Sequence, residues 1–194
     1  VVLSALVDYY GAMRRWKEAV LAITRFLAAS PQPSPEVRVR ALLRRAEIHA
    51  EGEMNAQRAV GVLHDVIALD PGQHEAYYHL AQELYLLGRY GEARTAIERV
   101  IELVTAPGAT LSAEALARYY YYKGRILDAA GDARSASQQY RRAGEYDPGY
   151  APPALVLARR AVEAGDHAQA ETLLIDAARA AIDGGGVLAA VPLQ

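Results

Sequence analysis

The chain has no cysteine, one tryptophan and one phenylalanine among its 194 residues. Without cysteine, neither a disulfide framework nor a metal site built on thiolates can form. No stretch approaches about 18 consecutive apolar residues, so the sequence predicts no membrane-spanning helix. The net charge is only −2, and this lack of a basic excess argues against a general binder of nucleic acid.

The sequence also lacks an initiator methionine and a basic stretch ahead of an apolar run. It opens with Val1, Val2 and Leu3, so we expect a trimmed piece of a longer bacterial protein from which any targeting signal was removed. The sequence therefore does not assign a cellular compartment. We favour the cytoplasm, with the periplasm as the alternative if a signal was trimmed.

Five alanines recur in one local frame, each one helical turn before a large apolar residue. Their spacings of 40, 34, 43 and 34 residues indicate a repeat of about 34 residues with two insertions. A fixed period of this length is typical of a helical repeat array. The alanines are Ala19, Ala59, Ala93, Ala136 and Ala170, and the large residues are Ile23, Leu63, Ile97, Tyr140 and Leu174.

Apolar residues between these marks recur at steps of three and four, which places one apolar stripe on each predicted helix. Three glycines follow the first helix of a unit, where a left-handed residue ends the helix and glycine adopts it without strain. Three prolines close second helices, because proline cannot continue a helix. The glycines are Gly88, Gly131 and Gly165, and the prolines are Pro31, Pro71 and Pro148.

This pattern resembles the tetratricopeptide repeat (TPR) family, whose repeat combines an aromatic residue, a small pair, an alanine, a large apolar residue and a final proline. Three units carry the match, and Glu47, Thr105 and Lys123 depart from it. The matching residues are Trp16, Ala19, Ile23 and Pro31 in the first unit, Tyr77, Leu80, Ala81, Ala93 and Ile97 in the third, and Gly124, Ala136, Tyr140 and Pro148 in the fourth.

The resemblance implies an all-α, right-handed superhelical solenoid of about five helix-turn-helix repeats. At least three such units are needed to bury a common core, and five meet this need. We expect one domain over 1–184 and a flexible tail over 185–194. The units are predicted at 1–33, 40–73, 74–107, 117–150 and 151–184.

The extra residues fall at 34–39 and 108–116, between units. Ser34 and Ser112 are typical helix N-caps, each followed by an acidic residue in the first turn. We expect each insertion to lengthen the following helix at its N-terminus. The alternative is a protruding partner-binding loop with its tip at 105–108.

No motif predicts catalysis, a cofactor or a metal. His74 and His79 are five residues apart, which on a helix separates them by about 140° and prevents them from sharing one ion. Gly184, Gly185 and Gly186 precede no Lys-Ser or Lys-Thr pair, so they form no phosphate loop. We therefore expect a protein that is not an enzyme.

The resemblance implies that the first helices line the concave face of the superhelix, which leads to a candidate peptide-binding groove. Its members are mostly tyrosine and arginine, residue types enriched at interface hot spots and suited to acidic and apolar side chains of a ligand. The predicted groove residues are Arg44, Arg45, Tyr78, His79, Gln82, Tyr85, Arg118, Tyr121, Tyr122, Arg125 and Arg159.

Four consecutive tyrosines on one helix point around its whole circumference, so they cannot all contact a ligand. We assign Tyr120 to the core of its unit and Tyr119 to packing against the preceding unit. Tyr121 and Tyr122 are left either for the groove or for packing. For each arginine, a solvated charge is as good an interpretation as a contact with the ligand.

Three functions are compatible with this sequence. The first is a protein-interaction scaffold that holds a peptide or helix of a partner in the concave groove. The second is a self-assembly module, because no polar capping helix follows the fifth unit and its last helix is expected to expose apolar surface. The third is binding of single-stranded RNA by stacking on aromatic residues, against which the near-neutral charge counts.

Overall fold

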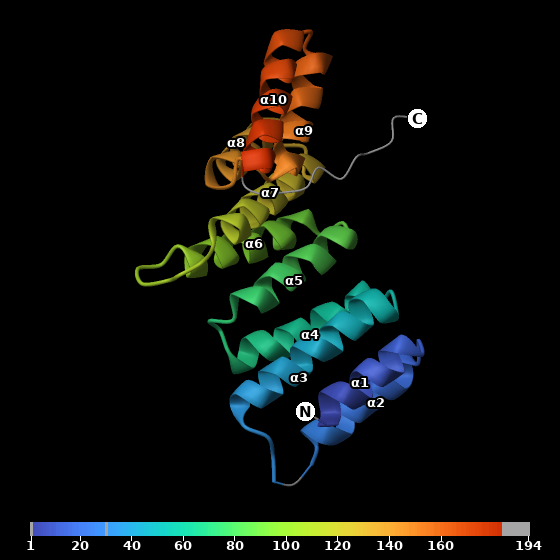
Figure 1. Ribbon diagram of the computed structural model, residues 1–194. Coiled ribbons are helices and arrows are strands. Elements are labelled where there is room, and N and C mark those ends of the chain that lie inside the picture. Colours follow the sequence, from blue (N-terminus) through green and yellow to red (C-terminus); the bar gives the residue numbers. More distant parts are fainter. Residues whose placement is uncertain (1, 30, 184–194) are drawn as a thin grey trace. The chain divides into compact units, whose positions relative to one another are not determined.

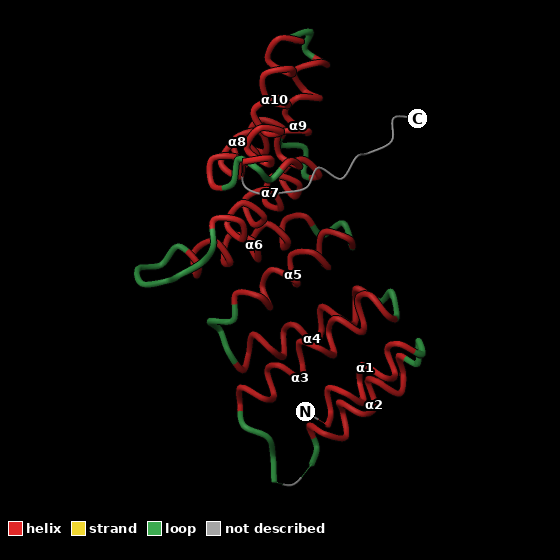
Figure 2. Tube along the Cα trace, viewed as in Figure 1, coloured by secondary structure: helices red, strands yellow, loops and turns green. Residues whose placement is uncertain are grey.

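A computed structural model describes residues 2–29 and 31–183, and within them it contains ten α-helices, one π-helical segment and no strand (Figures 1 and 2). Short turns join the helices into consecutive pairs. The predicted tail at 185–194 lies outside the described residues. The helices are α1 (Val2–Ala12), α2 (Trp16–Leu27), α3 (Pro35–Glu47), α4 (Ala56–Leu69), α5 (His74–Leu86), α6 (Tyr90–Val104), α7 (Ala113–Ala129), α8 (Ala133–Tyr146), α9 (Ala151–Glu163) and α10 (His167–Asp183), and the π-helical segment η1 (Ile48–Gly52) continues α3.

The chain divides into two compact units, 1–100 and 101–194. In the first unit each helix from α1 to α5 packs against its neighbour in the sequence, and in the second unit the same holds from α7 to α10. Such nearest-neighbour packing is characteristic of repeat arrays, in which each unit is stabilised by those beside it.

The recurring alanines are buried in the structure. Ala19, Ala59, Ala93 and Ala136 are completely buried, and Ala170 is nearly so. The large residue one turn later is also buried in four pairs. Leu174 is the exception, since it is 42% exposed on α10.

The exposure of Leu174 fits the expectation that the last helix of the array exposes apolar surface. The neighbouring Leu173 packs against the buried Ala158, Ala161 and Ala170 instead. Leu174 faces away from α9, and within the described residues no later helix follows α10 to cover it.

The turn glycines behave as predicted. Gly88, Gly131 and Gly165 have φ angles of 73°, 86° and 81°, in the left-handed region that glycine adopts without strain.

Both insertions lengthen a helix at its N-terminus, as expected. Helix α3 begins at Pro35 with Ser34 at its N-cap, five residues before the repeat frame requires. Helix α7 begins at Ala113, four residues early, and the Ser112 side chain accepts a hydrogen bond from the Ala115 backbone N–H. Residues 105–112 form an exposed loop before α7.

Candidate functional site

Three of the predicted groove residues gather in one pocket of the first unit. Tyr78, His79 and Gln82 project from α5 into a cavity of about 200 Å³, whose other side is formed by α3, η1 and α4. The His79 Nδ1 lies 3.1 Å from the Gln82 Oε1, and the Tyr78 ring centroid lies 5.9 Å from that of His79. All three side chains are half-buried. The first helices of two successive pairs thus share a polar and aromatic recess.

Three carboxylates line the same pocket: Glu47, Glu51 and Glu83. Glu83 is only 8% exposed, and in the described part of the chain its carboxylate makes no hydrogen bond or ion pair. Burial raises the pKa of Glu83, nearby Glu51 raises it further, and His79 lowers it. A buried acid without a partner is costly to ionise, so a cation placed in this pocket would relieve a real penalty.

The two arginines expected on this face are occupied within the chain. Arg44 donates to Asp8 on α1 at 3.0 Å and to Glu47 at 2.8 Å. Arg45 lies 3.5 Å from Asp65 on α4. The carboxylate of Glu47 raises the pKa of Arg44. The positive charge predicted for this part of the groove is therefore largely balanced by carboxylates of the same unit.

Tyr85 lies one turn beyond Gln82 and faces the turn of its own helix pair. Its ring is half-buried, with its centroid 5.7 Å from that of Tyr90. It does not line the pocket that Tyr78, His79 and Gln82 share.

In the second unit the tyrosine run is mainly packing. Tyr120 is 5% exposed and stacks on Tyr146 of α8 at 5.2 Å, which confirms its place in the core of the unit. Tyr122 is also buried, at 7% exposure. Tyr121 is half-buried between the rings of Tyr140 and Tyr150, at 5.6 and 5.7 Å.

Two of the arginines predicted in this unit, Arg118 and Arg159, form exposed ion pairs within their own helices. Arg118 pairs with Glu114 one turn away at 2.5 Å, and Arg159 lies 3.9 Å from Glu163, all on exposed helix surface. The Arg125 guanidinium lies 5.4 Å from the centre of the Tyr122 ring. Exposed pairs of this kind contribute little to stability and exchange readily for contacts with a ligand.

A separate cluster joins three helices of this unit. Asp128 on α7 accepts hydrogen bonds from the Tyr140 hydroxyl at 2.6 Å and from the Arg160 guanidinium of α9. Arg160 also donates to Ser137 on α8. Burial, reinforced by Asp128, raises the pKa of Tyr140. This network is explained by helix packing and offers no site for a ligand.

The sequence alone did not identify Glu83 as a member of this pocket. The available signal was a carboxylate at 83 between the apolar positions Leu80 and Leu84 of one helix face. An acidic residue at such a position must either pair with a cation or a hydrogen-bond donor, or cost free energy when it ionises. Only the packing of the helices shows which of the two applies.

Among the described residues no helix is long and apolar enough to cross a membrane. The same residues contain no group of three or more histidine or acidic side chains placed to hold a metal ion.

Helix pairs that pack on their sequence neighbours, with recurring buried alanines and with glycines at the turns, define a helical-repeat protein of the solenoid class. The family model for the tetratricopeptide repeat matches residues 50–107. The resemblance drawn from the sequence is thereby confirmed, and the chain has the fold of TPR proteins, which is typical of protein-interaction modules.

Solved structures support the same fold. MamA from Desulfovibrio magneticus RS-1 aligns with a TM-score of 0.71 at 21% identity, over 94% of each chain. BtubC from P. vanneervenii aligns with a TM-score of 0.75 at 16% identity, over 99% of this chain and 83% of its own. TPR-like repeats from Podosopora anserina give 0.71 at 19% identity, over 94% of this chain and 95% of theirs. No curated protein matches by sequence.

Proposed function

We propose that this chain is a non-enzymatic scaffold that binds a peptide or helix of a partner protein in the groove lined by its first helices. The observation that carries the proposal is the pocket between α3, η1 and α5, where Tyr78, His79 and Gln82 surround the buried Glu83. A recess with aromatic walls and a few converging polar groups is the usual form of a specific binding site.

The pocket's charge points to the chemistry of the ligand in this unit. Arg44 and Arg45 are already paired with carboxylates, whereas Glu51 and Glu83 line the pocket without a paired cation among the described residues. A lysine or arginine side chain of the partner would supply that cation and contact the Tyr78 ring. In this unit the expected ligand is basic, where the sequence alone had suggested an acidic one.

The proposal can be tested by titrating the protein with the peptide Ac-ALKLA-NH2 and following backbone amide shifts by NMR. We expect shifts in α5 and η1 and weaker binding, by roughly tenfold, when glutamine replaces lysine in the peptide. The variant Glu51→Gln with Glu83→Gln should remove this preference. The matched variant Glu75→Gln with Glu171→Gln removes two exposed acids outside the pocket and should retain it. Equal affinity for both peptides would contradict the proposal.

One observation favours a second function, self-assembly through α10. This helix exposes Leu174, Ile175 and Ile182 at 42%, 41% and 59%. Contiguous exposed apolar side chains are typical of interaction surfaces. Light scattering over a range of concentrations should then show association that Leu174→Gln with Ile175→Gln abolishes. A monomer at every concentration would argue against this function.

A further inference from the structure

The turns inside the first two helix pairs differ from the other three. The left-handed turn residue is glycine at 88, 131 and 165, but it is Arg14 in the first pair, with φ 53°, and Met54 in the second, with φ 52°. A side chain in this conformation is strained, because its Cβ lies too close to the following carbonyl oxygen. Two strained residues therefore stand where glycine would be free of strain.

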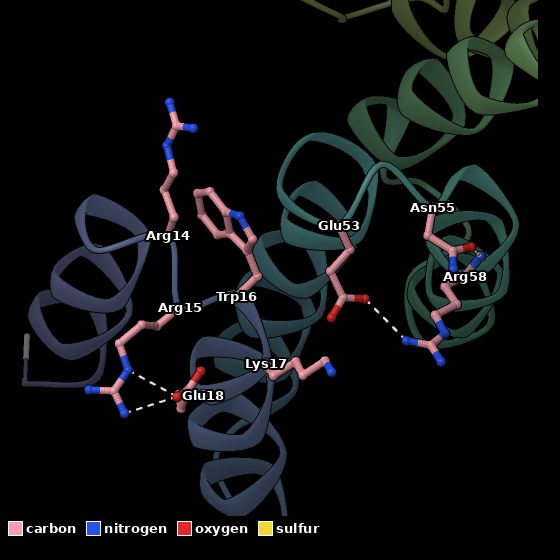
Figure 3. Close-up of a pocket in the computed structure, with 8 residues that line it drawn as sticks. All are labelled: Arg14, Arg15, Trp16, Lys17, Glu18, Glu53, Asn55 and Arg58. Atoms are coloured by element: carbon pink, nitrogen blue, oxygen red, sulfur yellow. Dashed lines mark hydrogen bonds and ion pairs between the residues drawn. The ribbon is translucent and has the colours of Figure 1, made fainter.

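One of them, Arg14, lines a pocket that is separate from the groove pocket. Together with Glu53 and Asn55, Arg14 lines a cavity of about 530 Å³ between the start of α2 and the turn after η1 (Figure 3). Met54 is 84% exposed. Of the two strained residues, Arg14 lines this recess and Met54 does not.

The acidic residues of this pocket are already paired with basic side chains of the same chain. Glu18 lies 2.9 Å from the Arg15 guanidinium. Glu53 lies 3.2 Å from Arg58 and 2.9 Å from the ring of His49. Hydrogen bonding to His49, followed by Arg58, lowers the pKa of Glu53.

Two further cations line the pocket without such partners. Arg14 and Lys17 are exposed, and within the described residues neither side chain makes a hydrogen bond or an ion pair. The pocket therefore carries a local excess of positive charge on a chain whose net charge is −2. A negatively charged group would be attracted to this position.

The pocket also has an apolar wall. Trp16, the only tryptophan, packs so closely on Gly52 that a Cβ there would lie 2.6 Å from its ring, and it leaves part of the indole exposed. Figure 3 shows the indole between Arg14 and Glu53, with Lys17 extending along the same opening. The site combines an indole face with two cations whose side chains make no hydrogen bond or ion pair within the described residues.

We infer that this pocket is a second docking site, which binds an acidic segment of a partner protein. Carboxylates of the segment pair with Arg14 and Lys17, and an apolar side chain packs on Trp16. Glu18 and Glu53 alternate with the cations and would repel a continuous phosphate backbone, so separated carboxylates fit better than nucleic acid. None of these residues belongs to the groove pocket, so the inference stands independently of the proposed function.

Trp16 provides the readout, since it is the only tryptophan and lines the site. We expect the peptide Ac-ELELE-NH2 to change the tryptophan fluorescence saturably, with an affinity that falls as salt is added. The analogue with glutamine in place of glutamate lacks the carboxylates that pair with the two cations, so it should bind roughly fivefold more weakly or not at all. The size of this effect follows from the small contribution of each exposed ion pair.

Arg14→Gly with Lys17→Ala should weaken the acidic peptide by roughly fivefold. Arg14→Gly also relieves the turn, so the variant should unfold at a temperature no lower than that of the parent, which separates lost binding from lost folding. Arg134→Ala with Arg141→Ala removes the same charge from the second unit and should leave binding unchanged. The inference is overturned if both variants weaken binding equally, if the peptide gives no saturable change, or if a single-stranded RNA oligonucleotide binds more tightly than the peptide.

Discussion

Close packing in the second unit depends on a single missing methyl group. A Cβ at Gly124 of α7 would lie 2.5 Å from the Tyr140 Cε1 on α8. The Tyr140 ring cannot retreat freely, because its hydroxyl is hydrogen-bonded to Asp128. The glycine and the tyrosine are therefore one structural feature, in which the absence of a side chain on one helix makes room for a large one on the next.

We expect Gly124→Ala to destabilise the protein by about 1–3 kcal/mol through overpacking. Thermal unfolding followed by circular dichroism measures this. Gly144→Ala is the matched control in the same unit, since a Cβ there meets nothing within 4 Å. The control should be neutral or stabilising, and similar losses from both variants would show that the contact with Tyr140 is not the cause.

Glu83 is the second residue whose effect can be measured alone. Its raised pKa means that the folded protein favours the protonated acid more than the unfolded chain does. Its contribution to stability is thus favourable at low pH and is lost as the pH rises from the unfolded value, about 4.3, through the folded one.

Glu83→Gln should therefore raise the unfolding temperature at pH 7, with a gain that shrinks as the pH falls towards 4. Differential scanning calorimetry at several pH values would test this. An unchanged or lower unfolding temperature at pH 7 would show that the carboxylate is paired in solution. A gain in stability together with lost binding of the basic peptide is the pattern expected of a functional residue that is costly to the fold.

At the scale of elements, the helix caps separate two serines that look alike in the sequence. The Ser112 side chain caps α7 by accepting from the Ala115 N–H. Ser34 occupies the same position before α3 but makes no capping hydrogen bond, and its Oγ lies 3.1 Å from the Glu36 carboxylate instead.

Ser112→Ala should cost about 1 kcal/mol of folding free energy, the usual effect of removing an N-cap. Ser34→Ala should cost clearly less, because there is no cap to lose. Urea unfolding of both variants measures the difference. Equal costs would mean that Ser34 also caps its helix in solution.

At the scale of the whole molecule, stability should fall towards the end of the array. Helix α4 has five buried residues, whereas α10 has one, Ala170. A helix packed on only one neighbour has less buried surface to hold it closed.

Hydrogen exchange followed by mass spectrometry should therefore show the fastest opening in α10 and markedly slower exchange in α4. The comparison within one protein needs no variant. Protection of α10 equal to that of α4 would indicate that its exposed face is covered in solution, as self-assembly requires.

Much of the fold could be predicted because its determinants are local. The alanine frame, the turn glycines and the serines before α3 and α7 each act within a few residues, and the structure confirms their positions. The exposure of Leu174 is not set by its own repeat, because it depends on whether a further helix packs on α10. The groove residues were harder for the same reason, since partners such as Asp8 for Arg44 lie far away in the sequence.

The sequence by itself determined the repeat, the helix pairs and their recurring alanines, because period, caps and turns are properties of short segments. Only the tertiary structure decided the charges that are left for a partner. Arg44 and Arg45 are paired with carboxylates of other helices, and Glu83 is buried. Arg14 and Lys17 line a pocket together with Trp16. Such charge pairing depends on distances between different helices, which spacing along one chain does not specify.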